Sequence, residues 1–161
     1  MTSDIRSFLQ EIKKTNDLIK VKKKVSTKYE IAALTAKLDG SKAVLFENIK
    51  GSKFKLVSNL VGSRDRFAQA IGSKKSDINQ KIVRAISSAK KPKISTNAKF
   101  FENSSKDISI LPTVTHFQNE SGPFITSSIL YTQNQEKKSQ NSSIHRLMPI
   151  GKNQFTIRMV E

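Results

Sequence analysis

In the first half of the chain, apolar residues recur every three or four positions, the spacing that gathers them on one face of an α-helix. The clearest run is Ile5–Ile12, in which the apolar positions follow the pattern i, i+3, i+4 and i+7. Residues suited to helix ends flank these runs, namely Ser3, Thr27 with Glu30, Ser63 and Ser76 at starts and Gly40 and Gly72 at stops. We therefore expect helices over residues 5–12, 28–39, 63–72 and 77–90.

Continuous or alternating apolar runs predict strands between these helices and in the rest of the chain. In the first half they cover 17–25, 43–49 and 55–61, the last two flanking a Gly51-Ser52 turn. After Pro92 strands dominate, with runs at 98–103, 108–117 and 122–132 and a final pair around Gly151-Lys152-Asn153. The polar stretch 133–143 is interpreted as a long hairpin loop.

This order of elements predicts an α+β fold in which the early helices pack on a β-rich half that curls into a barrel-like sheet. Pro92 is the expected boundary, with an N-terminal α/β segment at 1–92 and the start of a β-rich domain at 93–161.

The final hairpin carries an arginine in each strand. Because side chains alternate faces along a strand, Ile144, Arg146 and Met148 should share one face. If the turn is centred near Lys152, Arg158 lies opposite Arg146. Like charges across an antiparallel pair are destabilising, so an anion between them would explain the pair. The alternative is that both arginines lie on a solvated face.

Composition narrows the chemistry. The 161 residues include no cysteine and two histidines, which excludes disulfides, thiolate zinc sites and a cysteine nucleophile and disfavours a histidine-built metal site. No secretion signal or membrane-spanning run is apparent, so we expect a soluble, cytoplasmic protein. The formal charge is +16, much of it in lysine runs at 20–24, 73–77 and 89–93. These runs have few aromatic neighbours, so a solvated face or an acidic partner is favoured over nucleic acid.

The stretch Asn141–Arg146, NSSIHR, resembles the Asn-x-x-x-x-Arg element of the UbiD-type decarboxylases. Further segments resemble the same family in the same order, at 44–72 (containing FENIKG and SNLVGSRDR), at 110–126 (ILPTVTHFQNESGPFIT) and at 150–160 (IGKNQFTIRMV). His145 matches archaeal-type members. Ordered motifs along nearly the whole chain are more specific than any one of them.

This resemblance implies a flavin-binding domain with a split-barrel-like sheet, prenylated FMN (prFMN) as the cofactor, and Mn²⁺ bridging to its phosphate, with K⁺ or Na⁺ as a further ion. It implies that Arg146 belongs to a catalytic Glu-Arg-Glu network and that Asn141 binds the metal. Contacts with prFMN are implied for Thr126, Ile144, His145, Arg146, Arg158, Met159 and Val160. From the sequence pattern alone, His145 is more often a packed or solvated histidine.

Members of this family are well over twice as long, and no acidic residue here matches the two catalytic glutamates. We therefore expect the N-terminal portion of a carboxy-lyase, either a fragment or a split subunit, that is inactive alone and assembles as a homo-oligomer when complete. The implied substrate is an unsaturated or aromatic carboxylic acid, with anhydromevalonate phosphate and polyprenyl-benzoate acids as candidates. The alternative is a non-catalytic basic module that binds an acidic protein or nucleic acid.

Overall fold

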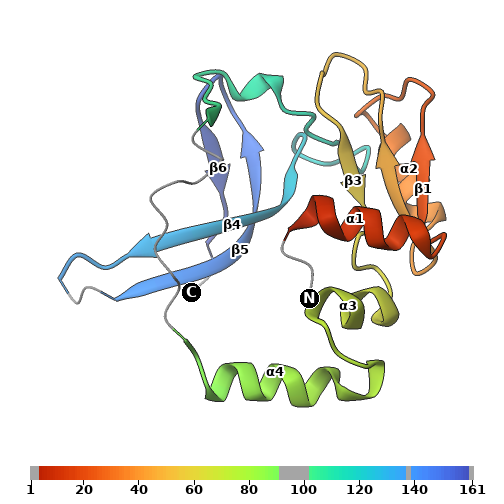
Figure 1. Cartoon of the computed structure of the whole chain (residues 1–161). Helices are drawn as coiled ribbons and strands as arrows, with labels where there is room; N and C mark the ends of the chain where they lie inside the picture. The colour runs from red at the N-terminus through yellow and green to blue at the C-terminus, as the bar shows by residue number, and fades with distance from the viewer. Residues whose placement is uncertain (1–3, 91–101, 137–138, 160–161) are drawn as a thin grey trace. The chain divides into compact units, whose positions relative to one another are not determined.

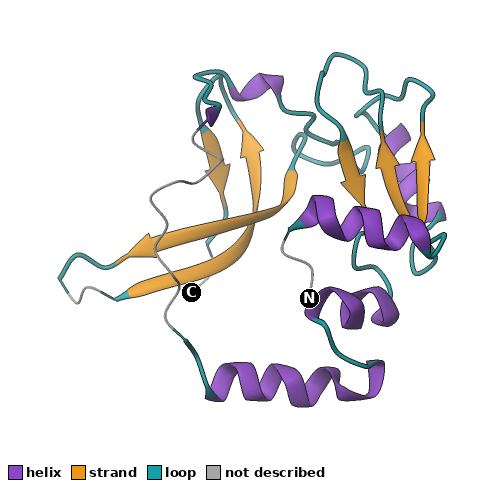
Figure 2. Ribbon diagram, in the orientation of Figure 1, coloured by secondary structure: helices purple, strands orange, loops and turns teal. Residues whose placement is uncertain are grey.

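The computed structural model describes residues 4–90, 102–136 and 139–159 (Figure 1). Helices and strands alternate in the first half and strands dominate the second, which confirms the predicted α+β class (Figure 2). The elements are α1 (Ile5–Lys14), β1 (Leu18–Val21), α2 (Glu30–Lys37), β2 (Ala43–Phe46), β3 (Leu56–Ser58), α3 (Arg64–Ile71), the 3₁₀ helix η1 (Lys75–Asp77), α4 (Ile78–Ser87), the 3₁₀ helix η3 (Ile108–Ile110), β4 (Ile125–Gln133), β5 (Gln140–Pro149) and β6 (Phe155–Ile157).

The chain folds as two compact units, each assembled from separate stretches of sequence. The first contains Met1–Lys22, Thr35–Phe46 and Leu56–Ser104, and the second contains Lys23–Leu34, Glu47–Lys55 and Ser105–Glu161. The boundary predicted at Pro92 lies outside the described residues and stays a prediction. No helix of the described residues is long and apolar enough to cross a membrane.

The first unit is built on the sheet β1–β2–β3, in which β1 runs parallel to β2 and β2 antiparallel to β3. Helix α1 covers this sheet because its apolar stripe, with Phe8 and Ile12 fully buried, packs against Ala43 of β2. Its N-cap is Asp4, whose Oδ1 accepts a hydrogen bond from the Ser7 amide at 2.8 Å. The predicted cap, Ser3, lies outside the described residues.

Helix α3 begins and ends where its sequence predicts. The Ser63 hydroxyl accepts a hydrogen bond from the Arg66 amide at 3.2 Å, which satisfies one of the free amides of the first turn. At the other end Gly72 adopts a left-handed conformation with φ of 66°, which glycine reaches without a steric cost. Helix α4 differs, because the Ser76 hydroxyl donates to the Asp77 carboxylate and makes no cap bond, so the predicted Ser76 cap is wrong.

Arg66 is an unusual part of this unit because it is charged and only 2% exposed. Its guanidinium donates hydrogen bonds to three backbone carbonyls, those of Leu60, Ser41 and Asn59. Arg66 thereby joins α3 to the segment before β2, at Ser41, and to the segment after β3, at Asn59 and Leu60. Sequence reasoning counted Arg66 only as a helix residue within a family-like motif.

The second unit has its own small core, formed by Val25, Ile31, Ile49 and Val114. Two parallel bridges join its distant segments, Val25 to Ile49 and Lys28 to Thr115. The capping box predicted for α2 is wrong, because the Glu30 carboxylate accepts from the Ser26 amide at 2.8 Å instead of from Thr27. Tyr29, with a left-handed φ of 68°, turns the chain just before α2, so the Glu30 carboxylate meets the amide of Ser26 and not that of Thr27.

The strand predicted over 108–117 is also wrong. Residues 108–110 form the 3₁₀ helix η3, and only isolated bridges follow in this run, Val114 to Phe124 and Thr115 to Lys28. Pro112 lies in the middle of this apolar run and lacks the amide that a ladder needs, which explains the interruption. The strand predicted over 98–103 lies largely outside the described residues.

The sheet of the second unit is β4–β5–β6, with both pairs antiparallel. Pairing of β4 with β5 continues to Gln133 and Gln140, so part of the predicted loop 133–143 is strand. Between Ile125 and Ser128 the register shifts, which places a bulge at Thr126 and Ser127. Within the described residues this sheet is open, with no closed barrel.

Candidate functional site

The hairpin of β5 and β6 brings its two arginines together as predicted. The pairs Met148 with Thr156 and Pro149 with Phe155 are symmetric about residue 152. One further step of this register, just past the pair of Leu147 with Ile157 that ends β6, sets Arg158 level with Arg146. Strand alternation then places both arginines on the same face as Met148 and Thr156.

A cleft of about 420 Å³ opens on this face. It is lined by Ser121, Phe124, Arg146, Met148, Thr156, Ile157 and Arg158. Two cations and two hydroxyl groups thus stand among an aromatic ring, a thioether and an aliphatic side chain. Apolar walls with a few polar groups are typical of sites for small organic molecules.

The Arg146 guanidinium lies over the ring of Phe124, with its Cζ 4.7 Å from the ring centroid. This cation–π contact orients the guanidinium beside the cleft. Phe124 is itself fixed by backbone hydrogen bonds with Val114, one of the core residues of this unit. The position of Arg146 therefore depends on the second unit's core.

Within residues 4–90, 102–136 and 139–159, neither arginine of the cleft has a counter-charge. Among the residues that the structure describes, no carboxylate lies within ion-pair distance of Arg146 or Arg158. Two adjacent unpaired guanidiniums create a strongly positive local potential. This arrangement is suited to an anionic ligand, since guanidinium groups bind carboxylates and phosphates bidentately.

Met148 forms part of the cleft wall, and Gly122 gives it room. A Cβ atom added at position 122 would lie 2.9 Å from the Met148 sulfur, closer than real Cβ contacts allow. Sequence reasoning did not single out Gly122, Phe124 or Met148 as site residues. The only signals were the GPFIT stretch for the first two and strand alternation with Arg146 for the third.

The turn of the hairpin is anchored on the segment before η3. The Ile108 amide donates to the Lys152 carbonyl at 2.6 Å. Beside it, the hydroxyl and amide of Ser109 donate to the Asp107 carboxylate, and these bonds lower its pKa, with Lys152 adding a favourable charge. The segment carrying Arg146 and Arg158 is thus tied at its turn.

Of the other predicted cofactor residues, those that the structure describes do not line the cleft. Thr126 lies in the β4 bulge between Ile125, which pairs with Leu147, and Ser128, which pairs with His145. Thr126 is therefore at the level of Arg146 along β5. Ile144 shares the arginine face and is 75% exposed opposite Ile129. His145 lies on the opposite face, where its Nε2 is 3.0 Å from the Ser143 hydroxyl. Met159 is exposed, and Val160 lies outside the described residues.

Asn141, the predicted metal ligand, is not brought beside Arg146. It pairs with Thr132 near the loop end of the β4–β5 hairpin. Asn141 lies five positions before Arg146, so strand alternation places the two side chains on opposite faces of β5. In the described ranges, His, Cys, Asp and Glu side chains form no group of three that could hold a metal ion.

Comparison with known proteins agrees with this geometry. Residues 9–86 match the family described as 3-octaprenyl-4-hydroxybenzoate carboxy-lyase N-terminal domain, and residues 87–161 match its Rift-related domain. The chain belongs to the UbiD family. Within the UbiD family, the chain is 32% identical over 96% of its length to an anhydromevalonate phosphate decarboxylase of Methanosarcina mazei and 26% identical over 97% to that of Methanothermobacter thermautotrophicus.

A solved UbiD-class structure shows the same fold. HmfF from Pelotomaculum thermopropionicum, in complex with FMN, matches 96% of this chain with a TM-score of 0.91 and 30% sequence identity. This chain spans 36% of HmfF and 36% of each of the two curated decarboxylases. These UbiD relatives therefore contain a long region that has no counterpart in the 161 residues.

Proposed function

We propose that this chain forms part of the cofactor and substrate site of a UbiD-family carboxy-lyase that decarboxylates an unsaturated or aromatic carboxylic acid using prFMN. The observation that carries this proposal is the pair of uncompensated guanidiniums, Arg146 and Arg158, in one cleft with the ring of Phe124. A substrate acid and a flavin phosphate are both anions, and the cleft offers cations without carboxylate competitors.

The cleft residues fit a flavin. A flavin joins a flat aromatic ring system to an anionic phosphate, and the cleft combines Phe124 and Met148 with two arginines. The FMN complex of HmfF, a structural relative, supports this assignment. When bound, prFMN would supply the group that accepts the electrons of the broken carbon–carbon bond.

In this proposal Arg146 is the catalytic residue of the chain. Its guanidinium stays charged at any working pH and would hold the carboxylate of the substrate bidentately, with Phe124 fixing its plane. Arg158 would neutralise a second negative charge on the same face. Further cofactor contacts are proposed for Thr126, Ile144, His145, Met159 and Val160.

The described residues do not fit a complete manganese site. Asn141 offers one neutral oxygen, whereas a hard divalent ion takes about six oxygen ligands, several of them carboxylates. Mn²⁺ at Asn141, with K⁺ or Na⁺ beside it, would require ligands from beyond the described residues.

The proposed partners follow from the same incompleteness. No carboxylate of the described residues lines the cleft, so we propose that a proton donor and the glutamates of the implied network would come from a C-terminal region or a separate subunit. We expect the completed assembly to be a homo-oligomer. Anhydromevalonate phosphate is the first substrate candidate, because two of the relatives carry that name. Alone, the 161-residue chain should release no carbon dioxide from it when prFMN and Mn²⁺ are supplied.

Flavin binding tests the proposal directly. FMN would be titrated into the full chain while its fluorescence is followed, with Arg146→Gln and Arg158→Gln as variants. Each lost charge-assisted contact should weaken binding about tenfold. Arg64→Gln is the matched control, because it removes one exposed positive charge from α3. Equal FMN affinity in all three variants and the parent chain would refute the assignment of the cleft.

A further inference from the structure

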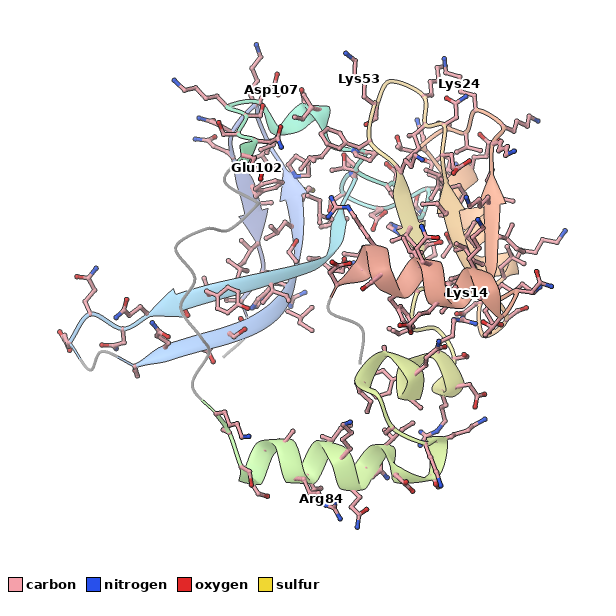
Figure 3. All side chains as sticks on the ribbon, in the orientation of Figure 1. Lys14, Lys24, Lys53, Arg84, Glu102 and Asp107 are labelled. Atoms are coloured by element: carbon pink, nitrogen blue, oxygen red, sulfur yellow. The ribbon has the colours of Figure 1, made fainter. Side chains whose placement is uncertain are left out.

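The first unit contains a second cavity, of about 720 Å³, between the end of α3 and the exposed side of α4. It is lined by Gly72, Ser73, Lys74, Asp77, Gln80, Lys81, Arg84 and Ala85. All of these residues belong to one unit, and none is among the residues of the arginine cleft. Figure 3 labels Arg84 on α4.

The cavity has an excess of positive charge. Lys74, Lys81 and Arg84 line it, against the single carboxylate of Asp77. In the part of the chain that the structure describes, no ion pair joins any of these three cations to a carboxylate. The neighbouring Lys75 is different, because its Nζ lies 2.9 Å from the Asp65 carboxylate. Uncompensated cations around a concave surface raise the local concentration of anions.

Two hydrogen bonds shape this wall. The Lys81 Nζ donates to the Gly72 carbonyl at 2.7 Å, which holds the lysine across the mouth of the α3–α4 turn. The Asp77 carboxylate accepts from the Ser76 hydroxyl at 2.6 Å, so part of its acceptor capacity is already used. Among the residues that the structure describes, no side-chain hydrogen bond or ion pair engages Lys74 or Arg84.

Ser73 provides an independent indication of a ligand. Its hydroxyl oxygen is buried and is the one buried side-chain polar atom of the described residues without a hydrogen-bond partner. Buried polar groups are nearly always paired, and leaving one unpaired costs about 1–3 kcal/mol. Ser73 lines the cavity, so a turn of its side chain would bring the hydroxyl out to a ligand held there and supply the missing partner.

We propose that this cavity binds a phosphorylated small molecule, separate from the acid and flavin of the arginine cleft. A phosphate group carries a charge of about −1.5 to −2 and three acceptor oxygens, enough to accept from Lys74, Arg84 and the Ser73 hydroxyl together. A carboxylate has two oxygens and one charge and would leave a donor unused. The volume is in the range of sites for molecules of nucleotide size.

Inorganic pyrophosphate is a suitable first probe for the full chain, followed by the amide NMR signals of residues 72–85. Saturable shifts confined to this segment are expected. The double variant Lys74→Gln, Arg84→Gln should weaken binding about a hundredfold, since each charge-assisted contact contributes about a factor of ten or more. Ser73→Ala should weaken it about threefold to tenfold, the effect of one neutral hydrogen bond.

Two controls separate a site from general attraction to a basic protein. Lys23→Gln, Lys24→Gln removes the same charge from exposed lysines and should leave the affinity unchanged. Citrate, a polycarboxylate of similar charge, should bind far more weakly than pyrophosphate. The proposal is overturned if pyrophosphate gives no saturable shifts, if both double variants lose affinity equally, or if citrate binds as well. Circular dichroism checks that each variant is folded.

Discussion

Arg66 offers the sharpest test of how this fold is held together. The substitution Arg66→Met keeps a long unbranched side chain in the buried position and removes every hydrogen-bond donor. The carbonyls of Leu60 and Ser41 then lose their partner, whereas the carbonyl of Asn59 keeps the hydrogen bond from the Gly62 amide. At 2% exposure the site admits little solvent to replace the lost bonds.

The size of the effect follows from these bonds. An unpaired buried carbonyl costs about 1–3 kcal/mol, and two of them set an upper limit of about 6 kcal/mol. The variant also avoids the cost of burying a charge, which offsets part of this loss. We expect a net loss of about 2–4 kcal/mol in the free energy of unfolding. An ordinary domain has about 5–15 kcal/mol in total.

Urea denaturation followed by circular dichroism measures this loss, and the melting temperature should fall by roughly 10 °C. Arg66→Lys should be intermediate, because an ammonium group reaches fewer of the three carbonyls. Arg64→Ala is the control, an exposed arginine of the same helix whose loss should cost no more than about 0.5 kcal/mol. A loss below about 1 kcal/mol in Arg66→Met would show that the three bonds contribute little to stability.

Two further predictions concern the cleft and α1. Gly122→Ala should weaken FMN binding severalfold, because the added Cβ would lie 2.9 Å from the Met148 sulfur and push that side chain into the cleft. Adding Met148→Ala to the same chain should restore the FMN affinity. Unchanged FMN affinity in Gly122→Ala alone would show that Gly122 does not keep Met148 out of the cleft. The Ser7 amide lowers the pKa of Asp4 below its ordinary 3.8, so the stabilisation of α1 is present above that value and is lost as pH falls through the lowered pKa. Helicity measured from about pH 6 to pH 2 should show this loss, and Asp4→Asn should remove it, whereas an identical profile in both chains would exclude Asp4 as the titrating group.

Local signals predicted the helices well because each depends on a few neighbouring residues. Ser63 and Gly72 bound α3 as expected, since a cap hydroxyl and a left-handed glycine act within one turn. The capping box at Thr27 failed because Tyr29 has a positive φ that no residue type announces. The strand through Pro112 failed because proline lacks a ladder amide, and of its apolar residues only Val114 reaches a core that distant segments complete.

In the candidate site, too, features that depend on neighbouring residues were predictable and those that depend on distant residues were not. The sequence predicted that Arg146 and Arg158 lie opposite each other, because the short turn around Lys152 sets the register of the hairpin. Phe124 and Gly122 approach β5 only through tertiary packing, so spacing along the chain could not identify them. Ser73 is similar, because an unpaired hydroxyl becomes visible only when its surroundings are known.

The bridge between residues 27–29 and Thr115 has a consequence for synthesis on the ribosome. The Tyr29 amide donates to the Thr115 carbonyl, and the Thr115 amide donates to the Thr27 carbonyl, at 3.1 and 3.0 Å. Translation at about 5–20 residues per second separates these segments by roughly 4–17 s. During that interval Val25, Ile31 and Ile49 have no Val114 to complete their core. The second unit is therefore a late-folding part of the nascent chain, and its apolar residues are a natural target for chaperones.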